Sequence, residues 1–172
     1  FKEAYESLKS KRAKSLIVDL RDNTGGYVNA ALNIADLFVE NNKVLLITED
    51  KSGKRVMNYS QNEKEIDIPV VVLVNEYSAS ASEILTGILK DYGVAKIIGT
   101  RTYGKGVIQN VYPHVLNGAL KVTTAEYFTP NENKIHKIGI EPDEEVELDE
   151  SITTLTKEND NQLKRAIEIL KK

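Results

Sequence analysis

The sequence predicts an α/β fold that continues into an antiparallel β extension and ends in a C-terminal helix. Three observations carry this prediction. Residues 70–74 form an unbroken apolar run, which is typical of a strand buried on both faces. Short apolar runs of this kind alternate with stretches of helical periodicity over the first hundred residues. Beyond residue 107 the pattern changes to β-like segments separated by turn residues.

The expected elements follow in chain order. Apolar side chains recur on one face, as in a helix, over residues 1–8, 28–38, 79–90 and 160–170. Strands are predicted over residues 15–20, 44–47, 56–59, 70–74 and 95–99, with a hairpin turn at Asp50–Gly53. Later β segments are predicted over residues 107–112, 119–128 and 134–140, divided by Asn117-Gly118 and Pro130-Asn131. Asp160 suits the N-cap of the last helix, whose apolar face comprises Leu163, Ala166, Ile167 and Leu170.

Composition places the chain among soluble globular proteins, because 41% of its 172 residues are hydrophobic and 28% are charged. The absence of cysteine excludes disulfide bonds, thiolate catalysis and cysteine-ligated zinc. A formal net charge of −3, without a long basic run, excludes non-specific nucleic-acid binding. Acidic residues and histidines lack the spacing of metal ligands, and we expect neither a metal nor a cofactor. The apolar runs are too short to cross a membrane.

Three polar segments rich in glycine or serine follow predicted strands, at residues 19–26, 75–83 and 101–106. The carboxyl ends of parallel strands meet at one edge of a sheet, where ligands bind. We therefore expect the three segments to contribute to one composite site.

The second segment places Ser78, Ser80 and Ser82 where a strand passes into a helix. A serine at this junction lies beside the free N–H groups of a helix N-terminus, which favour a developing oxyanion. The same residues could instead only cap the helix, because serine is a preferred N-cap residue. Both interpretations stay open on the spacing alone.

A serine nucleophile needs a base, and the histidines His114 and His136 lie outside the three segments. Lys105, between Gly104 and Gly106, is the remaining candidate. Lysine can act as a general base once burial has lowered its pKa. The same pattern also fits an exposed turn lysine, and it is not a P-loop, because the motif G-x-x-x-x-G-K-[ST] is absent. Gly25-Gly26 either forms an ordinary turn or directs an amide into the site.

Taken in this order, D-L-R-D-N-T-G-G, S-A-S-A-S-E-I and Y-G-K-G-V-I-Q resemble the carboxyl-terminal processing (tail-specific) peptidases, which use a Ser–Lys dyad. The later segments V-T-T-A-E-Y-F-T-P and G-I-E-P-D are also similar to that family. The resemblance covers about residues 15–142. It implies a crotonase/Clp-protease-like fold, a layered mixed sheet with helices.

The resemblance also assigns roles to individual residues. It implies that Ser80 is the nucleophile, that Lys105 is the general base and that Gln109 orients the lysine. The oxyanion donors implied are the Ala81 amide and an amide of the Gly25-Gly26 pair. The chain departs from the family pattern at Tyr77 and at residues 131–133, away from the dyad.

The resemblance implies a serine endopeptidase that acts on proteins with apolar C-termini in an extracytoplasmic compartment. A peptidase core over residues 1–150 and a helical tail over residues 151–172 are expected. The family carries a PDZ domain before this region, so we expect the chain, which begins at Phe1, to be a fragment that meets a membrane only through a missing N-terminal region. The alternative is a non-catalytic module on the same fold that binds a ligand or peptide.

Overall fold

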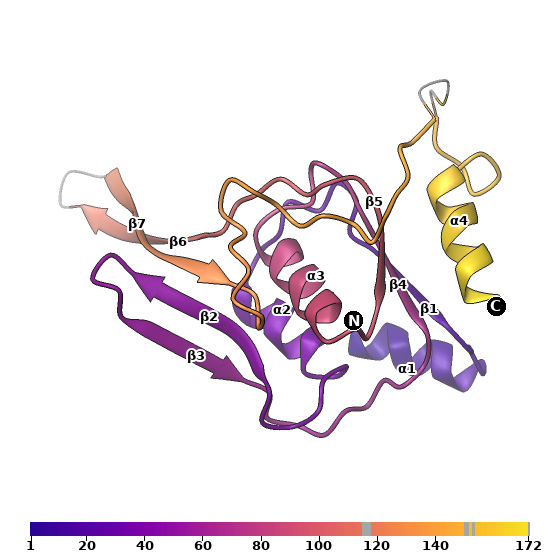
Figure 1. Ribbon diagram of the computed structural model, residues 1–172, viewed down its shortest axis with the longest axis horizontal. Helices are drawn as coiled ribbons and strands as arrows, with labels where there is room; N and C mark the ends of the chain where they lie inside the picture. Colours follow the sequence, from indigo (N-terminus) through magenta and orange to yellow (C-terminus); the bar gives the residue numbers. More distant parts are fainter. Residues whose placement is uncertain (115–117, 150–151, 153, 172) are drawn as a thin grey trace.

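The computed structural model describes residues 1–114, 118–149, 152 and 154–171, and its strands form two separate four-stranded sheets (Figure 1). Its elements are α1 (Lys2–Ser10), β1 (Leu16–Asp19), α2 (Val28–Ala35), β2 (Val44–Asp50), β3 (Arg55–Tyr59), β4 (Val70–Val74), α3 (Ala81–Asp91), β5 (Lys96–Gly99), β6 (Val107–His114), β7 (Gly118–Phe128), β8 (Glu144–Glu145) and α4 (Asn161–Leu170). This architecture confirms the α/β class with an antiparallel extension and a C-terminal helix.

The first sheet has the strand order β1-β4-β5-β8, and its neighbouring strands pair in parallel. Successive residues of β4 point to opposite faces, as the pleat of a strand requires. Val70 and Val72 belong to the main core on the side of α2 and α3, whereas Val71 and Leu73 belong to a second cluster on the side of α4. The unbroken apolar run of β4 therefore reflects burial on both faces.

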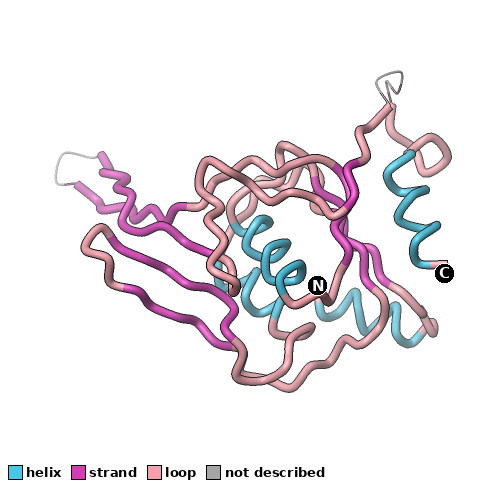
Figure 2. Tube along the Cα trace, in the orientation of Figure 1, coloured by secondary structure: helices cyan, strands magenta, loops and turns pink. Residues whose placement is uncertain are grey.

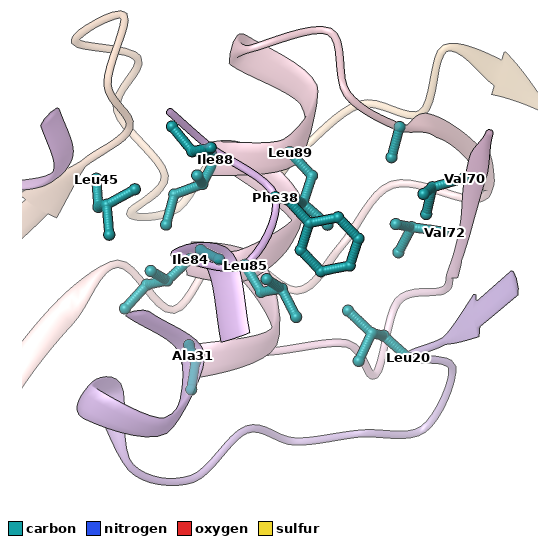
Figure 3. Close-up of a cluster of buried hydrophobic side chains, with 14 of the residues drawn as sticks. Leu20, Ala31, Phe38, Leu45, Val70, Val72, Ile84, Leu85, Ile88 and Leu89 are labelled. Carbon is teal, nitrogen blue, oxygen red and sulfur yellow. The ribbon is translucent and has the colours of Figure 1, made fainter. Parts of the chain in front are cut away.

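The main core lies between the parallel sheet and the helices α2 and α3 (Figure 3). Ile84, Leu85, Ile88 and Leu89 of α3 are all at most 4% exposed. Leu85 and Leu89 lie beside Phe38, which follows α2 (Figure 3). α4 lies on the opposite face of the sheet (Figure 1), where Ala166 belongs to the second cluster and Leu163 and Leu170 pack against it. The helices therefore cover both faces of the sheet. Among the described residues, no helix is long and apolar enough to cross a membrane.

The second sheet, in the order β3-β2-β7-β6, is antiparallel and extends away from the helices (Figure 1). The predicted hairpin turn is confirmed, because the Asp50 carboxylate accepts hydrogen bonds from the N–H groups of Ser52 and Lys54. These bonds hold the pKa of Asp50 below its usual value, with the Ser52 hydroxyl making the largest contribution. Asn117 of the second predicted turn lies outside the described residues.

The expected layered α/β fold with parallel and antiparallel strands is confirmed, and these strands form two separate sheets. Two details differ from the sequence-based expectation. The strand predicted over residues 134–140 is a turn, in which the N–H groups of Ile138 and Gly139 donate to the Ile135 carbonyl. Positive φ angles of 62° at Lys137 and 77° at Gly139 prevent an extended backbone there. The short strand β8, which pairs with β5, was not predicted.

Shortening a side chain in the main core should destabilise the fold far more than the same change at the surface. Ile88 is 0% exposed, so we expect Ile88→Ala to lower the free energy of unfolding by about 2–5 kcal/mol. Ile138 is 49% exposed, and Ile138→Ala serves as the matched control. Urea unfolding of both variants measures the difference, and equal losses would contradict this account of the core.

Candidate active site

The three polar segments that follow β1, β4 and β5 converge at the carboxyl edge of the parallel sheet, as predicted (Figure 2). Two serines of the second segment connect it to the first. The Ser78 hydroxyl donates to the Leu20 carbonyl at 2.7 Å, and the Ser82 hydroxyl donates to the Asn23 carbonyl at 2.9 Å. The backbone N–H of Tyr103, in the third segment, donates to the Ser78 carbonyl at 3.1 Å. Ser78 and Ser82 are therefore structural.

Ser80 differs from its neighbours in backbone conformation. It is the N-cap of α3, where the sequence placed it, with φ 56° and ψ −117°. A positive φ is strained in a non-glycine residue and persists only where the surroundings enforce it. Gly25 presses against the same turn, since a Cβ on Gly25 would lie 2.5 Å from the Ala79 carbonyl oxygen and 2.9 Å from the Ser80 Cβ. Ser80 is therefore held in a sharp turn at a helix N-terminus, half-buried and next to the first segment.

A buried carboxylate connects the second and third segments. Glu83, one turn into α3, is 0% exposed. Its Oε1 accepts from the Thr102 hydroxyl at 2.7 Å and from the Gly104 N–H at 2.6 Å. Its Oε2 accepts from the N–H groups of Ser80 at 2.9 Å and Lys105 at 2.8 Å. The backbones of Ser80 and Lys105 therefore share one acceptor atom, which places the two segments side by side.

The glycines on either side of Lys105 allow the turn at 134–140 to pack against the backbone. A Cβ on Gly106 would lie 2.4 Å from the His136 backbone nitrogen, and one on Gly104 would lie 3.1 Å from the Gly139 nitrogen. Lys105 itself is half-buried, and its carbonyl accepts a hydrogen bond from the hydroxyl of Tyr127. The lysine segment is therefore enclosed by α3 on one side and by the 134–140 turn on another.

Tyr127 and Glu83 are the site residues to which sequence reasoning gave no role, although both lie in the motifs that carry the resemblance. Tyr127 is 1% exposed, and its N–H donates to the Gly106 carbonyl at 3.0 Å. Burial raises the pKa of the Tyr127 hydroxyl, and a hydrogen bond with the Ser80 side chain acts in the opposite direction. Its hydroxyl donates to the Lys105 carbonyl, so Tyr127 connects β7 to the lysine segment.

Gln109 and His136, which the sequence analysis also considered, lie beyond the third segment. Gln109 is exposed on β6, beside a β-bulge between Ile108 and Gln109, and its amide donates to the Thr123 hydroxyl at 3.3 Å. Within the described part of the chain, no hydrogen bond joins the Lys105 ammonium to the Ser80 hydroxyl or to Gln109. The His136 Nδ1 is buried without a hydrogen-bond partner among the described residues.

The N–H of Gly25 donates to the Asn23 Oδ1 at 3.0 Å, whereas the space around Gly26 is open. Next to this pair lies a pocket of about 150 Å³. Its lining is mainly apolar, with Leu20, Tyr27, Ala30, Ala31, Ile34, Ala81 and Leu85. A small apolar side chain would fit beside the helix N-terminus. Within the residues described by the structure, no cluster of His, Asp and Glu side chains could hold a metal ion.

Comparison with known proteins identifies the family to which this chain belongs. The family model for peptidase family S41 matches residues 1–146, and the chain belongs to that family. It is 38% identical over 168 residues to the carboxyl-terminal-processing protease of Synechocystis, a match that covers 97% of this chain and 39% of the relative. It is 42% identical over 141 residues to the chloroplastic carboxyl-terminal-processing peptidase 3 of Arabidopsis thaliana, covering 81% of this chain and 27% of the relative.

Solved structures give the same assignment. A photosystem II D1 C-terminal processing protease is 39% identical, with a TM-score of 0.76, over 91% of this chain and 40% of that protein. An S41 protease from Bacteroides fragilis has a TM-score of 0.82 at 19% identity and shows the shared fold, over 98% of this chain and 48% of that protein. The chain therefore spans less than half the length of these relatives.

The contact between Gly25 and the Ser80 turn leads to a matched test on adjacent glycines. We expect Gly25→Ala to lower the free energy of unfolding by about 1–3 kcal/mol, because the backbone has φ 95° and the added Cβ meets backbone atoms. Gly26→Ala should change it by less than about 0.5 kcal/mol, because no atom lies within 4 Å of its Cβ position. Thermal and urea unfolding measure both variants, and a larger loss in Gly26→Ala would refute the packing described.

Replacing the Glu83 carboxylate by an amide should separate the two segments. Glu83→Gln leaves an NH₂ group facing N–H donors, and we expect a loss of about 1–3 kcal/mol in the free energy of unfolding. Glu158→Gln, at an exposed position, is the control. Amide hydrogen exchange should speed up at Gly104 and Lys105 in Glu83→Gln alone. Unchanged protection at these amides would contradict the bridging role of the carboxylate.

Proposed function

We propose that this chain is the core of a serine endopeptidase of the carboxyl-terminal processing type, in which Ser80 and Lys105 form the catalytic dyad. The observation that carries the proposal is the Glu83 carboxylate, which binds the backbone N–H groups of both residues through one oxygen. The Ser80 turn, at the N-terminus of a helix, has the local geometry that a nucleophile requires. The family assignment and the names of the relatives support the same reading.

In this mechanism the Ser80 hydroxyl attacks the scissile carbonyl carbon while the neutral Lys105 amine takes its proton. The negative charge that develops on the carbonyl oxygen is stabilised by the Ala81 N–H and by an N–H of the Gly25-Gly26 pair. Use of the Gly25 amide requires release of its hydrogen bond to Asn23. The protonated lysine then donates to the leaving amine, and water hydrolyses the acyl-enzyme by the same path. Gln109 orients the lysine in the assembled site.

The proposed substrates are proteins with apolar C-termini. The pocket beside Gly25 and Ala81 supports this preference, because its walls are largely aliphatic and its volume of about 150 Å³ suits a small apolar side chain. We further propose that a PDZ domain of the full-length protein presents the substrate tail, and that the enzyme works in an extracytoplasmic compartment. The relatives include a chloroplastic peptidase, which is consistent with work outside the cytoplasm.

Kinetics of the full-length protein test the dyad. We expect Ser80→Ala and Lys105→Ala each to remove nearly all turnover of a peptide with an apolar tail, and the double variant to lose little more, because the two residues act as one unit. Lys105→Arg should also be inactive, because a guanidinium does not lose its proton at accessible pH. Gln109→Ala should reduce kcat by less, because it positions the amine without taking the proton.

The control is His136→Ala, which should change kcat/KM by only a few-fold, since His136 has no part in the mechanism. Binding of the peptide by Ser80→Ala should persist. An active Lys105→Arg together with an inactive His136→Ala would overturn the Ser–Lys mechanism. Tight peptide binding without turnover by the unmodified protein would favour the non-catalytic binding module instead.

A further inference from the structure

Outside the dyad, the most completely paired charged group near the site is the guanidinium of Arg21, whose side chain is 9% exposed. Its five N–H donors all have acceptors. Nε and Nη2 donate to the Asp19 carboxylate at 3.0 and 2.6 Å. Nη1 and Nη2 donate to the Asp160 carboxylate at 3.1 and 2.8 Å, and Nη1 also donates to the Gln162 Oε1 at 2.9 Å. We call these four residues the Arg21 cluster.

The Arg21 cluster connects the C-terminal helix to the parallel sheet. Asp160 is the N-cap of α4, and its Oδ1 accepts from the Leu163 N–H at 2.8 Å as well as from Arg21. Its side chain is 3% exposed. Burial alone would raise the pKa of the Asp160 carboxyl, but the hydrogen bonds from Arg21 and Leu163 outweigh burial and lower it. The Gln162 amide donates to the Val146 carbonyl at 2.6 Å. This bond holds the Gln162 side chain in place, so that its Oε1 can accept from Arg21.

Arg21 also begins the stretch of residues 21–26, the 21–26 segment, in which Gly25 lies against the Ser80 turn. Asp22 follows it and exchanges two hydrogen bonds of 3.0 Å with the Asn75 side chain. The Asn23 carbonyl then accepts from the Ala79 N–H and the Ser82 hydroxyl, and its side chain accepts from the Gly25 N–H. The chain from Arg21 to Gly25 is therefore bonded at nearly every residue, with the Arg21 cluster at its start and the Ser80 Cβ against its end.

We propose that Asp160 is a positioning residue for peptide-bond hydrolysis, which acts through Arg21 to hold Gly25, and with it the Gly25-Gly26 pair, at the Ser80 turn. This proposal rests on the proposed function, since it assumes that the pair donates to the oxyanion. Asp160 touches neither substrate nor Ser80. Its two oxygens fix the direction of the guanidinium, and the guanidinium fixes where the 21–26 segment leaves β1. The C-terminal tail thereby becomes part of the machinery of the active site.

The sharpest variant is Asp160→Asn, because asparagine caps a helix as well as aspartate does while losing the charge and one acceptor. The matched control is Arg165→Gln, which removes the ion pair between α4 and Glu144 without touching the 21–26 segment. In the full-length protein we expect Asp160→Asn to lower kcat by roughly tenfold to a hundredfold with KM unchanged, as for a misplaced catalytic donor. Arg165→Gln should leave kcat within about twofold.

Hydrogen exchange of this chain gives a second measurement that does not need activity. In Asp160→Asn the hydrogen-bonded amides of Asp22, Asn23 and Gly25 should exchange roughly tenfold faster or more, while the amides of α4 keep their protection. Unchanged exchange in the 21–26 segment, or equal effects in Asp160→Asn and Arg165→Gln, would overturn the positioning role.

The two proposals fail in different ways. Full activity in Ser80→Ala would refute the proposed function, and the exchange rates would then still decide whether Asp160 orders the segment. Loss of activity in Ser80→Ala, together with normal kcat in Asp160→Asn, would leave the peptidase intact and refute the role of Asp160. If Asp160→Asn fails to fold, Asp19→Asn serves instead, because Asp19 is the half-exposed partner of Arg21. Asp19→Asn should lower kcat and speed exchange in residues 21–26, but by less than Asp160→Asn.

Discussion

The structure of the site depends on one buried carboxylate. Glu83 accepts four hydrogen bonds from residues of two segments that are about 20 positions apart in sequence. A carboxylate without exposed surface is stable only when its oxygens are fully hydrogen-bonded, so its burial requires all of these donors to be in place. The strained turn at Ser80 and the course of the Lys105 segment follow from this requirement. The position at the N-terminus of α3 adds a favourable interaction with the helix dipole.

The layers of the fold supply the rigid support that this arrangement needs. β4 is buried on both faces, between α2 and α3 on one side and α4 on the other. The Ser80 segment follows this strand directly, so its position is fixed by a strand whose five residues are all buried. The antiparallel sheet contributes Tyr127, whose hydroxyl contacts the Lys105 carbonyl. The segments of Ser80 and Lys105 thus follow strands of the parallel sheet, and the antiparallel sheet supports the lysine segment through this contact.

The glycine side of the site and the lysine side are held by different groups. Glu83 connects Ser80 with the lysine segment, whereas the Arg21 cluster and the Asn23 backbone bonds hold the glycine pair. Both devices use a buried ion or ion pair with its hydrogen bonds satisfied. Such groups contribute little net stability compared with an apolar core, but removing one partner is costly. They therefore specify a unique geometry more than they stabilise the fold.

Sequence alone determined the α/β class, the strand at 70–74, the cap at Asp160 and the convergence of three polar segments, because periodicity and turn residues act locally. It also placed Ser80 at the helix N-terminus. It could not show that the strands divide into two sheets, nor that residues 134–140 form a turn, since the isoleucines at 135, 138 and 140 suit a short β segment as well as a turn. The roles of Glu83, Tyr127 and Arg21 were decided only by tertiary structure, because their partners lie on distant segments, and a residue's burial and hydrogen-bond partners follow from packing rather than from its neighbours in sequence.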